Sequence, residues 1–236
     1  MCCVTRSPLI PDMTKNGVRA GYDAVAATYA EQFGDELDHK PLERGLLKAF
    51  CDMVPHGLIA DIGCGPGHIT RFLADRREDV VGLDLSPEMI AVARQHNPRL
   101  SFAAASMLNL PFSDEAFAGV VALYSIIHLC AQERAVAFGE FARTLVPEGR
   151  LLVSFHVDGP GFAPGDVNHL CTFLGQRVDM DGYFLHPAVV TRDLLANGFR
   201  VDARLDREPI AGIEFESRRC YILARRAVRS SHGPRA

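Results

Sequence analysis

Short, almost wholly apolar runs alternate with amphipathic segments through the middle of the chain. Runs of about four to eight apolar residues are typical of strands buried on both faces, and apolar residues three and four positions apart are typical of helices with one buried face. The pattern predicts strands over 58–62, 79–84, 100–104, 118–124 and 150–156, and helices over 67–75, 87–95 and 132–145. This alternation predicts an α/β fold in which helices cover both faces of a parallel sheet.

The segments on either side of this core follow other patterns. Apolar residues from Tyr22 to Phe33 recur at helical spacing, and Gly34 breaks that helix. The remaining predicted elements are helices over 41–51 and 191–197 and strands over 199–205 and 220–226. Residues 1–16 and 227–236 have no apolar period, so we predict that both segments are disordered.

Composition narrows the classes of function. With 48% of its 236 residues apolar, the chain can bury one substantial core, and we expect a single domain with appendages. The formal charge of −4 and the absence of a dense Lys/Arg run argue against nucleic acid as a partner. The chain has no apolar run of about eighteen residues and no secretory signal, so we predict a cytoplasmic protein without a membrane partner. Composition leaves the oligomeric state open.

The cysteines and histidines lack the spacing of metal ligands. Seven cysteines are scattered without a C-x-x-C pair, and buried free thiols are the simpler interpretation. No H-x-x-x-H pair occurs either. We therefore expect no metal site, while the adjacent Cys2 and Cys3 leave open a metal-binding or redox element near the N-terminus.

A glycine-rich segment follows the first predicted strand. It runs Asp61-Ile62-Gly63-Cys64-Gly65-Pro66-Gly67, and glycine there allows positive φ and a close approach of backbone N–H groups to a ligand. About twenty residues on, the second predicted strand ends at Asp84, and a carboxylate at such a position can accept both hydroxyls of a ribose. The sequence therefore predicts a site for an adenosine-containing cofactor.

The glycine spacing distinguishes between two such cofactors. A dinucleotide fingerprint G-x-G-x-x-G that starts at Gly63 requires glycine at position 68, where this chain has His68. Here the third glycine comes one position early, at Gly67, and Asp61 precedes the first glycine by two residues. The resulting string D-x-G-x-G-x-G resembles motif I of the class I S-adenosylmethionine (SAM)-dependent methyltransferases. A nicotinamide-dependent oxidoreductase and a cofactor-binding member that does not methylate remain the alternatives.

The resemblance covers positions 20–226. It is closest to a bacterial branch of the family that acts on small molecules, and it implies both a fold and an activity. The implied fold is a doubly wound, Rossmann-like sheet of order 3-2-1-4-5-7-6, mostly parallel, with the last strand antiparallel. Within one domain over 17–226, it implies a helical lid (17–53), a cofactor-binding core (54–157) and a substrate-side loop with the C-terminal strands (158–226). The implied reaction transfers a methyl group from SAM to an O, N or C atom of a small molecule and releases S-adenosylhomocysteine (SAH).

The resemblance also implies roles for individual residues. The glycine loop would surround the methionine part of SAM, with Asp61 orienting the loop or the ammonium group, while Asp84 would hold the ribose and Leu85 would pack on adenine. Ser106 stands where the family usually has an acid for the adenine amino group, and its hydroxyl can still form a hydrogen bond. The predicted cofactor-binding residues are Tyr22, Tyr29, Asp61, Gly63, Cys64, Gly65, Gly67, Asp84, Leu85, Ser106, Met107 and Tyr124. For Tyr22 and Tyr29, core packing alone also explains the spacing.

Two histidines follow predicted strands at the edge where ligands bind in parallel sheets. His128 and His156 are candidates for a general base, although a structural, hydrogen-bonded histidine is the simpler interpretation of each. Residues 159–165 are too rich in Gly and Pro for a core element, and we predict a mobile loop at the mouth of the substrate site.

Overall fold

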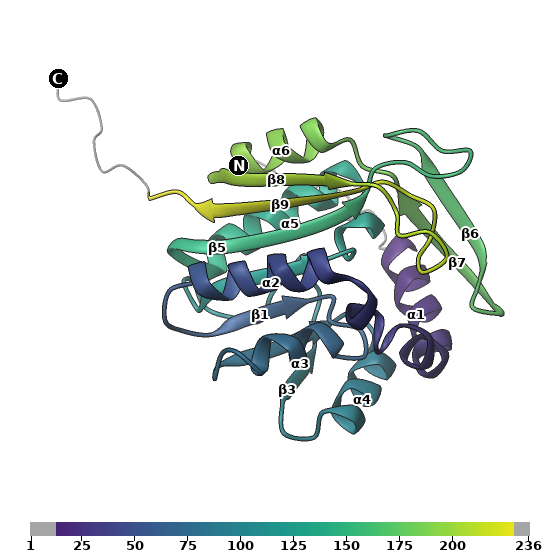
Figure 1. The fold of residues 1–236 in the computed structure, drawn as a ribbon, viewed down its shortest axis with the longest axis horizontal. Helices are drawn as coiled ribbons and strands as arrows, with labels where there is room; N and C mark the ends of the chain where they lie inside the picture. The colour runs from purple at the N-terminus through teal and green to yellow at the C-terminus, as the bar shows by residue number, and fades with distance from the viewer. Residues whose placement is uncertain (1–12, 229–236) are drawn as a thin grey trace, which may run out of the picture.

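The computed structural model describes residues 13–228, which form one mixed sheet, its covering helices and a separate hairpin (Figure 1). The strands of the large sheet are β1 (Ile59–Ile62), β2 (Val80–Asp84), β3 (Ser101–Ala104), β4 (Phe117–Leu123), β5 (Leu145–His156), β8 (Phe199–Arg207) and β9 (Arg219–Arg226). The α-helices are α1 (Met13–Phe33), α2 (Pro41–Met53), α3 (His68–Ala74), α4 (Pro87–His96), α5 (Ala131–Thr144) and α6 (Pro187–Ala196). Two short 3₁₀ helices, η1 (Glu36–His39) and η2 (Ile126–His128), follow α1 and β4, and the hairpin consists of β6 (Val167–Phe173) and β7 (Gln176–Tyr183).

The sheet has seven strands in the order β3-β2-β1-β4-β5-β9-β8. The first five are parallel, while β9 is antiparallel to both β5 and β8. Counted along the chain within this sheet alone, the order is the expected 3-2-1-4-5-7-6, so the predicted doubly wound α/β fold is confirmed. In this order β1 and β4 are neighbours, and a ligand crevice forms where the winding direction reverses.

Helices cover both faces of the sheet because its central strands are apolar on both sides. On one face Phe50 of α2 packs with Val121 of β4, and on the other face Phe141 of α5 packs with Val120 of the same strand. All four side chains are fully buried. Burying a side chain of this size contributes roughly 1.5–3 kcal/mol, so these two layers hold the strand ends in place.

The termini and one strand differ from the predictions. Residues 13–16, predicted to be disordered, form the first turn of α1, because a helix that is already formed extends at little cost per added residue. The predicted disorder of 1–12 and 229–236 lies outside the described residues. At the other end Ala227 still donates its N–H to the carbonyl of Gly198. Strand β5 begins five residues earlier than predicted, and residues 146–149 form a bulge opposite β4.

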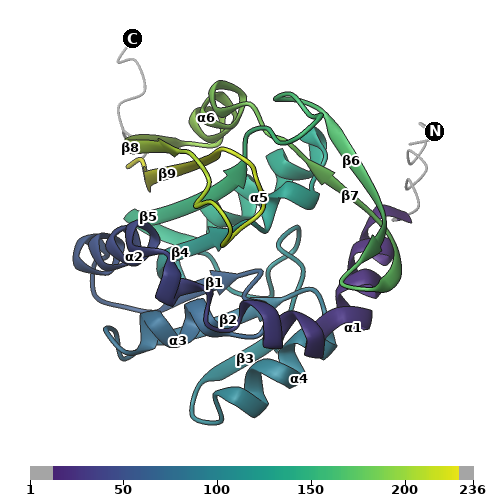
Figure 2. The same ribbon diagram turned by 45° about the vertical axis from the view of Figure 1, so that its right-hand side comes forward.

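The sequence did not predict the β6–β7 hairpin. It lies apart from the large sheet and crosses α1 (Figure 2), and most of its side chains are at least partly exposed. The hairpin packs against α1 and buries few side chains, so its sequence lacks the apolar runs that indicate a strand. The preceding segment 159–165, predicted to be a mobile loop, is a turn closed by reciprocal backbone hydrogen bonds between Gly159 and Phe162.

Two glycines on one face of α1 allow the helix to lie close to β7. A Cβ atom at Gly17 would come within 2.2 Å of the carbonyl oxygen of Asp179, and one at Gly21 would come within 3.1 Å of the sulfur of Met180. The first distance is far below van der Waals contact and involves backbone, which cannot rotate away. The position of α1 against the hairpin therefore depends on these glycines.

We expect Gly17→Ala to destabilise the protein by about 1–3 kcal/mol, because overpacking outweighs the better helix propensity of alanine. Gly45→Ala in α2 is the matched control, since nothing lies within 4 Å of a Cβ at that position. The control should be neutral or stabilising by up to about 1 kcal/mol. Urea unfolding of both variants tests this, and equal stabilisation by both substitutions would disprove the close packing of α1 on β7.

Candidate active site

A cavity of about 1240 Å³, part of it open to solvent, lies at the carboxyl ends of β1, β2 and β4. It is covered by α1 and bordered by η1, α2 and η2. Of the residues predicted for the site, those that line this cavity are Tyr22, Tyr29, Asp61, Gly63, Cys64, Gly65, Asp84, Leu85, Ser106, Met107, Tyr124 and His128. Gly67 and His156 do not line it.

The glycine loop passes directly from β1 into the cavity wall. Gly63 has φ +77° and Gly65 has φ +52°, a left-handed conformation that favours glycine. A Cβ at Gly63 would lie 2.3 Å from the Cβ of Ser125, whose hydroxyl donates to the carbonyl of Ile62 at 2.9 Å. The loop is thus fixed against the end of β4 as well as β1.

Asp84 is held on the opposite side of the loop by two backbone amides. Gly65 N–H donates to Oδ2 at 2.9 Å, and Ser86 N–H donates to Oδ1 at 2.8 Å. Burial raises the pKa of Asp84, while these two hydrogen bonds favour its charged form. Each carboxylate oxygen has further lone pairs for a ligand. Asp84 therefore presents an oriented hydrogen-bond acceptor to the cavity.

Asp61 lies beneath the loop and is only 2% exposed. The Thr70 hydroxyl donates to its Oδ2 at 2.6 Å, and burial raises the pKa of Asp61 to about 6.

A second carboxyl group, that of Glu36, lies near the start of α3, where Nε2 of His68 is 3.1 Å from its Oε1. Burial alone would raise the pKa of Glu36, but its contacts with His68 and Lys40 hold it at about 2. Two carboxyl groups therefore lie close to the first turns of α3.

Tyr22 and His128 form a partly buried pair over the cavity. The Tyr22 hydroxyl is 2.8 Å from His128 Nε2, and His128 Nδ1 is 2.7 Å from the carbonyl oxygen of Asp181 in β7. Because a carbonyl only accepts, Nδ1 carries the proton of the neutral ring and Nε2 accepts from Tyr22. Burial lowers the pKa of His128, which favours this neutral state. The hairpin missed by the sequence thus sets the tautomer of the candidate base.

The cofactor residues with less specific predictions make mostly local contacts. The ring of Tyr29 packs against Phe33 and against Phe173 of the hairpin, with centroids 4.6 and 6.3 Å away. Ser106 accepts Leu108 N–H at 3.3 Å within a tight turn, so its hydroxyl is partly used by its own backbone. Both residues still line the cavity, as do Leu85 and Met107.

Two predicted site residues have other surroundings. Gly67 precedes α3 with φ +86°, and a Cβ there would lie 2.8 Å from the ring of Phe102, so this glycine allows the turn to pack. His156 is 2.6 Å from the Ser217 hydroxyl and packs on the ring of Tyr124 at 5.1 Å. Burial lowers the pKa of His156 to about 3, so its ring is neutral and packed among aromatic side chains.

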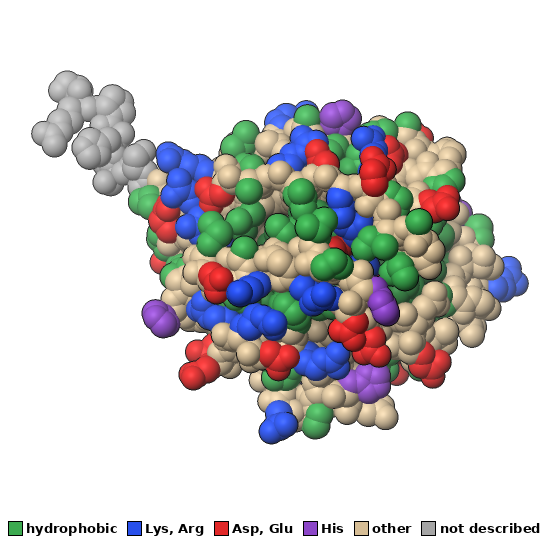
Figure 3. Space-filling model, in the orientation of Figure 1, with side chains coloured by type: hydrophobic (Ala, Val, Ile, Leu, Met, Phe, Trp, Pro, Cys, Tyr) green, Lys and Arg blue, Asp and Glu red, His purple; other side chains and the backbone are tan. Residues whose placement is uncertain are grey.

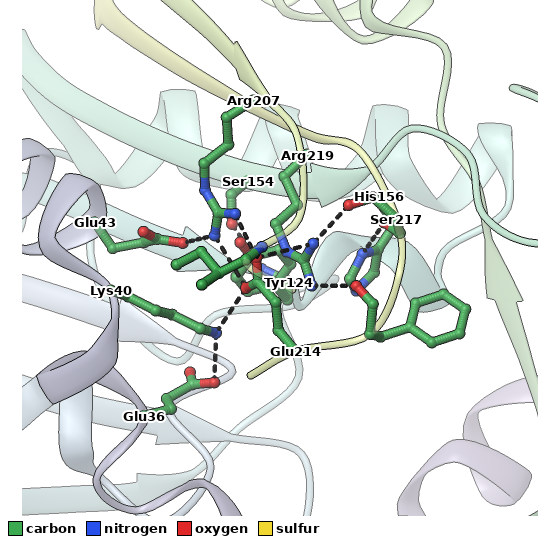
Figure 4. A network of polar contacts seen from close by, with 12 residues as sticks. Glu36, Lys40, Glu43, Tyr124, Ser154, His156, Arg207, Glu214, Ser217 and Arg219 are labelled. Carbon is green, nitrogen blue, oxygen red and sulfur yellow. Dashed lines mark hydrogen bonds and ion pairs between the residues drawn. The ribbon is translucent and has the colours of Figure 1, made fainter. Parts of the chain in front are cut away.

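Sequence reasoning missed a buried charged network beside the cavity (Figure 4). Lys40 pairs with Glu36 at 2.6 Å and lies 3.6 Å from Glu214. Arg207 pairs with both Glu43 and Glu214. One set of partners lies in η1 and around the start of α2. The other lies at the end of β8 and in the segment that follows it, more than 160 residues away along the chain, so no spacing in the sequence connects them. Three of these residues, Glu36, Lys40 and Glu43, also line the cavity.

A family model described as a methyltransferase domain matches residues 59–149, from β1 through the bulge in β5. Over these residues the chain is similar to a methyltransferase domain. The demethylmenaquinone methyltransferase of Renibacterium salmoninarum is 32% identical over 155 residues, which cover 65% of this chain and 64% of that protein. A structure titled as the complex of DhpI with SAH has a TM-score of 0.70 at 19% identity and covers 92% of this chain and 98% of that one. The expected class I methyltransferase fold is thereby confirmed.

Some of the relatives are much longer than this chain. The probable tRNA methyltransferase 9B of Homo sapiens is 36% identical over 100 residues, which cover 42% of this chain and 21% of that protein. The chain spans about a fifth of the length of this relative.

Within residues 13–228, no group of three or more His, Cys, Asp or Glu side chains is arranged to hold a metal ion. None of the helices described there combines the length and apolar character needed to cross a bilayer.

We expect His128 to be neutral and protonated on Nδ1 at pH 7. Long-range ¹H–¹⁵N NMR spectra of the imidazole report the tautomer, and a titration should give a pKa below the ordinary value of about 6.5. Tyr22→Phe should leave the Nδ1–H tautomer in place, because the carbonyl of Asp181 selects it. A proton on Nε2 in the wild type would contradict the assigned hydrogen-bond directions.

Proposed function

We propose that this protein is a SAM-dependent methyltransferase that transfers a methyl group to an O, N or C atom of a small molecule. The observation that carries the proposal is the joint fixation of Gly65 and Asp84 at the cavity wall, where one carboxylate is aligned by two backbone amides. This arrangement suits the two hydroxyls of a ribose. The methyltransferase domain match covers both residues.

The residues of the cavity fit the charge and shape of SAM. Asp84 is suited to the ribose and Asp61 to the ammonium group. The buried Nδ1 of His68 has no hydrogen-bond partner in the described part of the chain, so it is available to the carboxylate group of SAM. A side chain at Gly65 would project toward the ring of Tyr29, 3.9 Å away, into space that a bound ligand needs. When bound, SAM supplies a methyl group that is already activated by its sulfonium.

The Tyr22–His128 pair supplies the proton-accepting group that an oxygen or nitrogen nucleophile requires. His128 Nε2 has its lone pair directed at the Tyr22 hydroxyl, which lines the cavity. Tyr22 can pass its proton to Nε2 while accepting one from the acceptor molecule. Helix α1 carries Tyr22, and the hairpin holds His128 through the carbonyl of Asp181, so both cover this pair and limit its contact with water. In this proposal His156 has no part in the chemistry.

A dinucleotide fits this site poorly. The pyrophosphate of a nicotinamide cofactor needs free N–H groups at a helix N-terminus. At the start of α3, the Gly67 N–H already donates to the carbonyl of Cys64 at 3.0 Å, and the Asp61 and Glu36 carboxyl groups lie nearby. These negative charges would repel a pyrophosphate. Calorimetry with SAH and NADH separates the two hypotheses, and binding of NADH alone would overturn ours.

A small-molecule acceptor and a cytoplasmic location remain parts of this proposal. On the face seen in Figure 3, Lys and Arg side chains lie among Asp and Glu side chains, which supports the absence of a nucleic-acid partner. A member that binds SAM without methylating is the second candidate. Incubation with methyl-labelled SAM and a panel of phenols, amines and carboxylates tests it, and binding of SAM without label in any product would favour that alternative.

Asp84→Asn should weaken SAH binding roughly 10- to 100-fold, because a hydrogen bond to a charged group contributes about 1.5–3 kcal/mol. Isothermal titration calorimetry measures the change. Glu88→Gln on the exposed side of α4 is the matched control and should bind as the wild type does. Unchanged affinity in Asp84→Asn, with the fold intact by circular dichroism, would remove the ribose assignment.

SAH affinity should fall as the pH is lowered through about 6, where Asp61 takes up a proton. The charged carboxylate attracts the ammonium group, so binding favours the ionised form and lowers the pKa of Asp61 in the complex. At one pH unit below the pKa of Asp61 in the free protein, the affinity for SAH should be about tenfold weaker than at pH 7 to 8. Asp61→Asn should bind weakly at every pH between 5 and 8. A wild-type affinity that is constant over this range would contradict the role of Asp61.

A further inference from the structure

One wall of the cavity is formed by η1, the start of α2 and the residue after β4, Tyr124, which the sequence predicted to bind the cofactor. This acceptor wall consists of Glu36, Leu37, Lys40, Glu43 and Tyr124. Two of its polar members are almost fully enclosed, since Lys40 is 5% exposed and Glu43 is 2% exposed, while Glu36 and Tyr124 are partly buried. Enclosed polar groups on a cavity wall select a ligand by the hydrogen bonds they still lack.

The direction of each hydrogen bond on this wall follows from Glu43. Its carboxylate is paired with Arg207 and can only accept, so the Tyr221 hydroxyl donates to it. Tyr221 has then used its only proton. The contact between the hydroxyls of Tyr124 and Tyr221, at 2.5 Å, must therefore use the proton of Tyr124. Tyr124 keeps only acceptor lone pairs for a ligand.

Backbone geometry fixes Tyr124 in this role. The residue has φ +53°, a left-handed conformation that is unfavourable for a residue with a bulky side chain. Its N–H is held by the carbonyl of Ser154 at 3.0 Å, and Ser154 is paired with Tyr221 across β5 and β9. The pairing of β5 with β9 thus positions both tyrosines of this hydrogen-bonded pair, Tyr124 and Tyr221.

Tyr22 behaves in the same way on the roof of the cavity. Its proton is committed to His128 Nε2, because His128 donates its own proton to the carbonyl of Asp181. Both tyrosine hydroxyls with assigned hydrogen bonds on the cavity wall therefore act as acceptors. Oε2 of Glu43 adds another acceptor, since it has no partner in the described part of the chain.

The charges on the wall have the same preference. The acidic residues that line the cavity are Glu36, Glu43, Asp61, Asp84 and Glu133, whereas Lys40 is the one lining Lys or Arg among residues 13–228. Lys40 is bound to Glu36 and lies next to Glu214. The network contains two arginines, Arg207 and Arg219, and Arg219 pairs with Glu214. Neither lines the cavity, and Figure 4 shows both on the side of β8, β9 and the segment between them. The wall offers carboxylates and lone pairs, with its cation already paired.

We propose that the acceptor molecule binds as a cation, a small primary or secondary ammonium whose N–H groups donate to Tyr124 and Glu43. The proposal rests on the proposed function and names the substrate class for it. Leu37 and Leu123 supply apolar contact for the carbon part of such a molecule. Carboxylates and phosphates of similar size are disfavoured, because the acceptor wall carries two carboxylates against one cation, and Glu36 already holds that cation, Lys40.

The test compares pentylamine, pentanol and pentanoate, which share a chain and differ in the head group. Binding to the full chain is followed by NMR shifts of Tyr124 and its neighbours, with and without saturating SAH. We expect pentylamine to bind at least about tenfold more tightly than the other two, as a charged hydrogen bond predicts. Equal binding of the three, or preference for pentanoate or pentanol, would overturn the proposal.

Tyr221→Phe distinguishes hydrogen-bond direction from charge alone. This isosteric change leaves the Glu43–Arg207 pair intact and frees the Tyr124 proton, so Tyr124 can donate. Pentylamine should then lose about three- to tenfold in affinity and pentanoate should gain, while SAH affinity stays the same. Tyr183→Phe, outside the cavity, is the control and should change nothing. An unchanged amine preference in Tyr221→Phe would refute the role of Tyr124.

The same experiment separates this inference from the proposed function. If SAH does not bind but the amine preference and its loss in Tyr221→Phe persist, the inference stands and the methyltransferase assignment fails. If SAH binds and the amine preference is absent, the reverse holds.

Discussion

The structure of the site depends on one carboxylate held by two backbone amides. Gly65 can reach Asp84 only because its φ is positive, and the Ser86 amide fixes the other oxygen at the start of α4. The Ser86 hydroxyl in turn donates to Asp23 of α1 at 2.5 Å, so the same contact positions the covering helix. A loop, a strand end and the roof of the cavity thus share a single group of hydrogen bonds. Burial opposes the charge of Asp84, and these amides offset that penalty.

The directions of hydrogen bonds, more than their number, give the site its chemical character. Two hydrogen-bond chains each end at a group that can only accept. Tyr22 and His128 lead to the carbonyl of Asp181, and Tyr124 and Tyr221 lead to the carboxylate of Glu43. Each sets the orientation of every hydroxyl or imidazole before it. The result is a cavity lined by lone pairs and carboxylates at the acceptor end. A sulfonium cofactor and a cationic acceptor both suit such a field.

The sequence predicted the parts of the fold whose signal is local. Continuous apolar strands, closely spaced glycines and an acid at the end of β2 are visible within short windows, and the structure brings Gly63, Gly65 and Asp84 together on the cavity wall. The hairpin escaped because its strands are half-exposed and cover α1 rather than the sheet. The acceptor wall escaped because the partner of Glu43 lies 164 residues away in Arg207. His156 illustrates the converse, since its place after a strand resembles that of His128 but aromatic rings surround it.

In the proposed complex, Asp84 and the glycine loop hold the nucleoside of SAM at the carboxyl ends of β1 and β2. A crystal structure of the protein grown with SAH is the sharpest test of this arrangement. We expect both ribose hydroxyls within hydrogen-bond distance of the Asp84 carboxylate, with the sulfur facing Tyr22 and Tyr124. Density for SAH elsewhere, or a ribose turned away from Asp84 while the loop keeps its conformation, would contradict it.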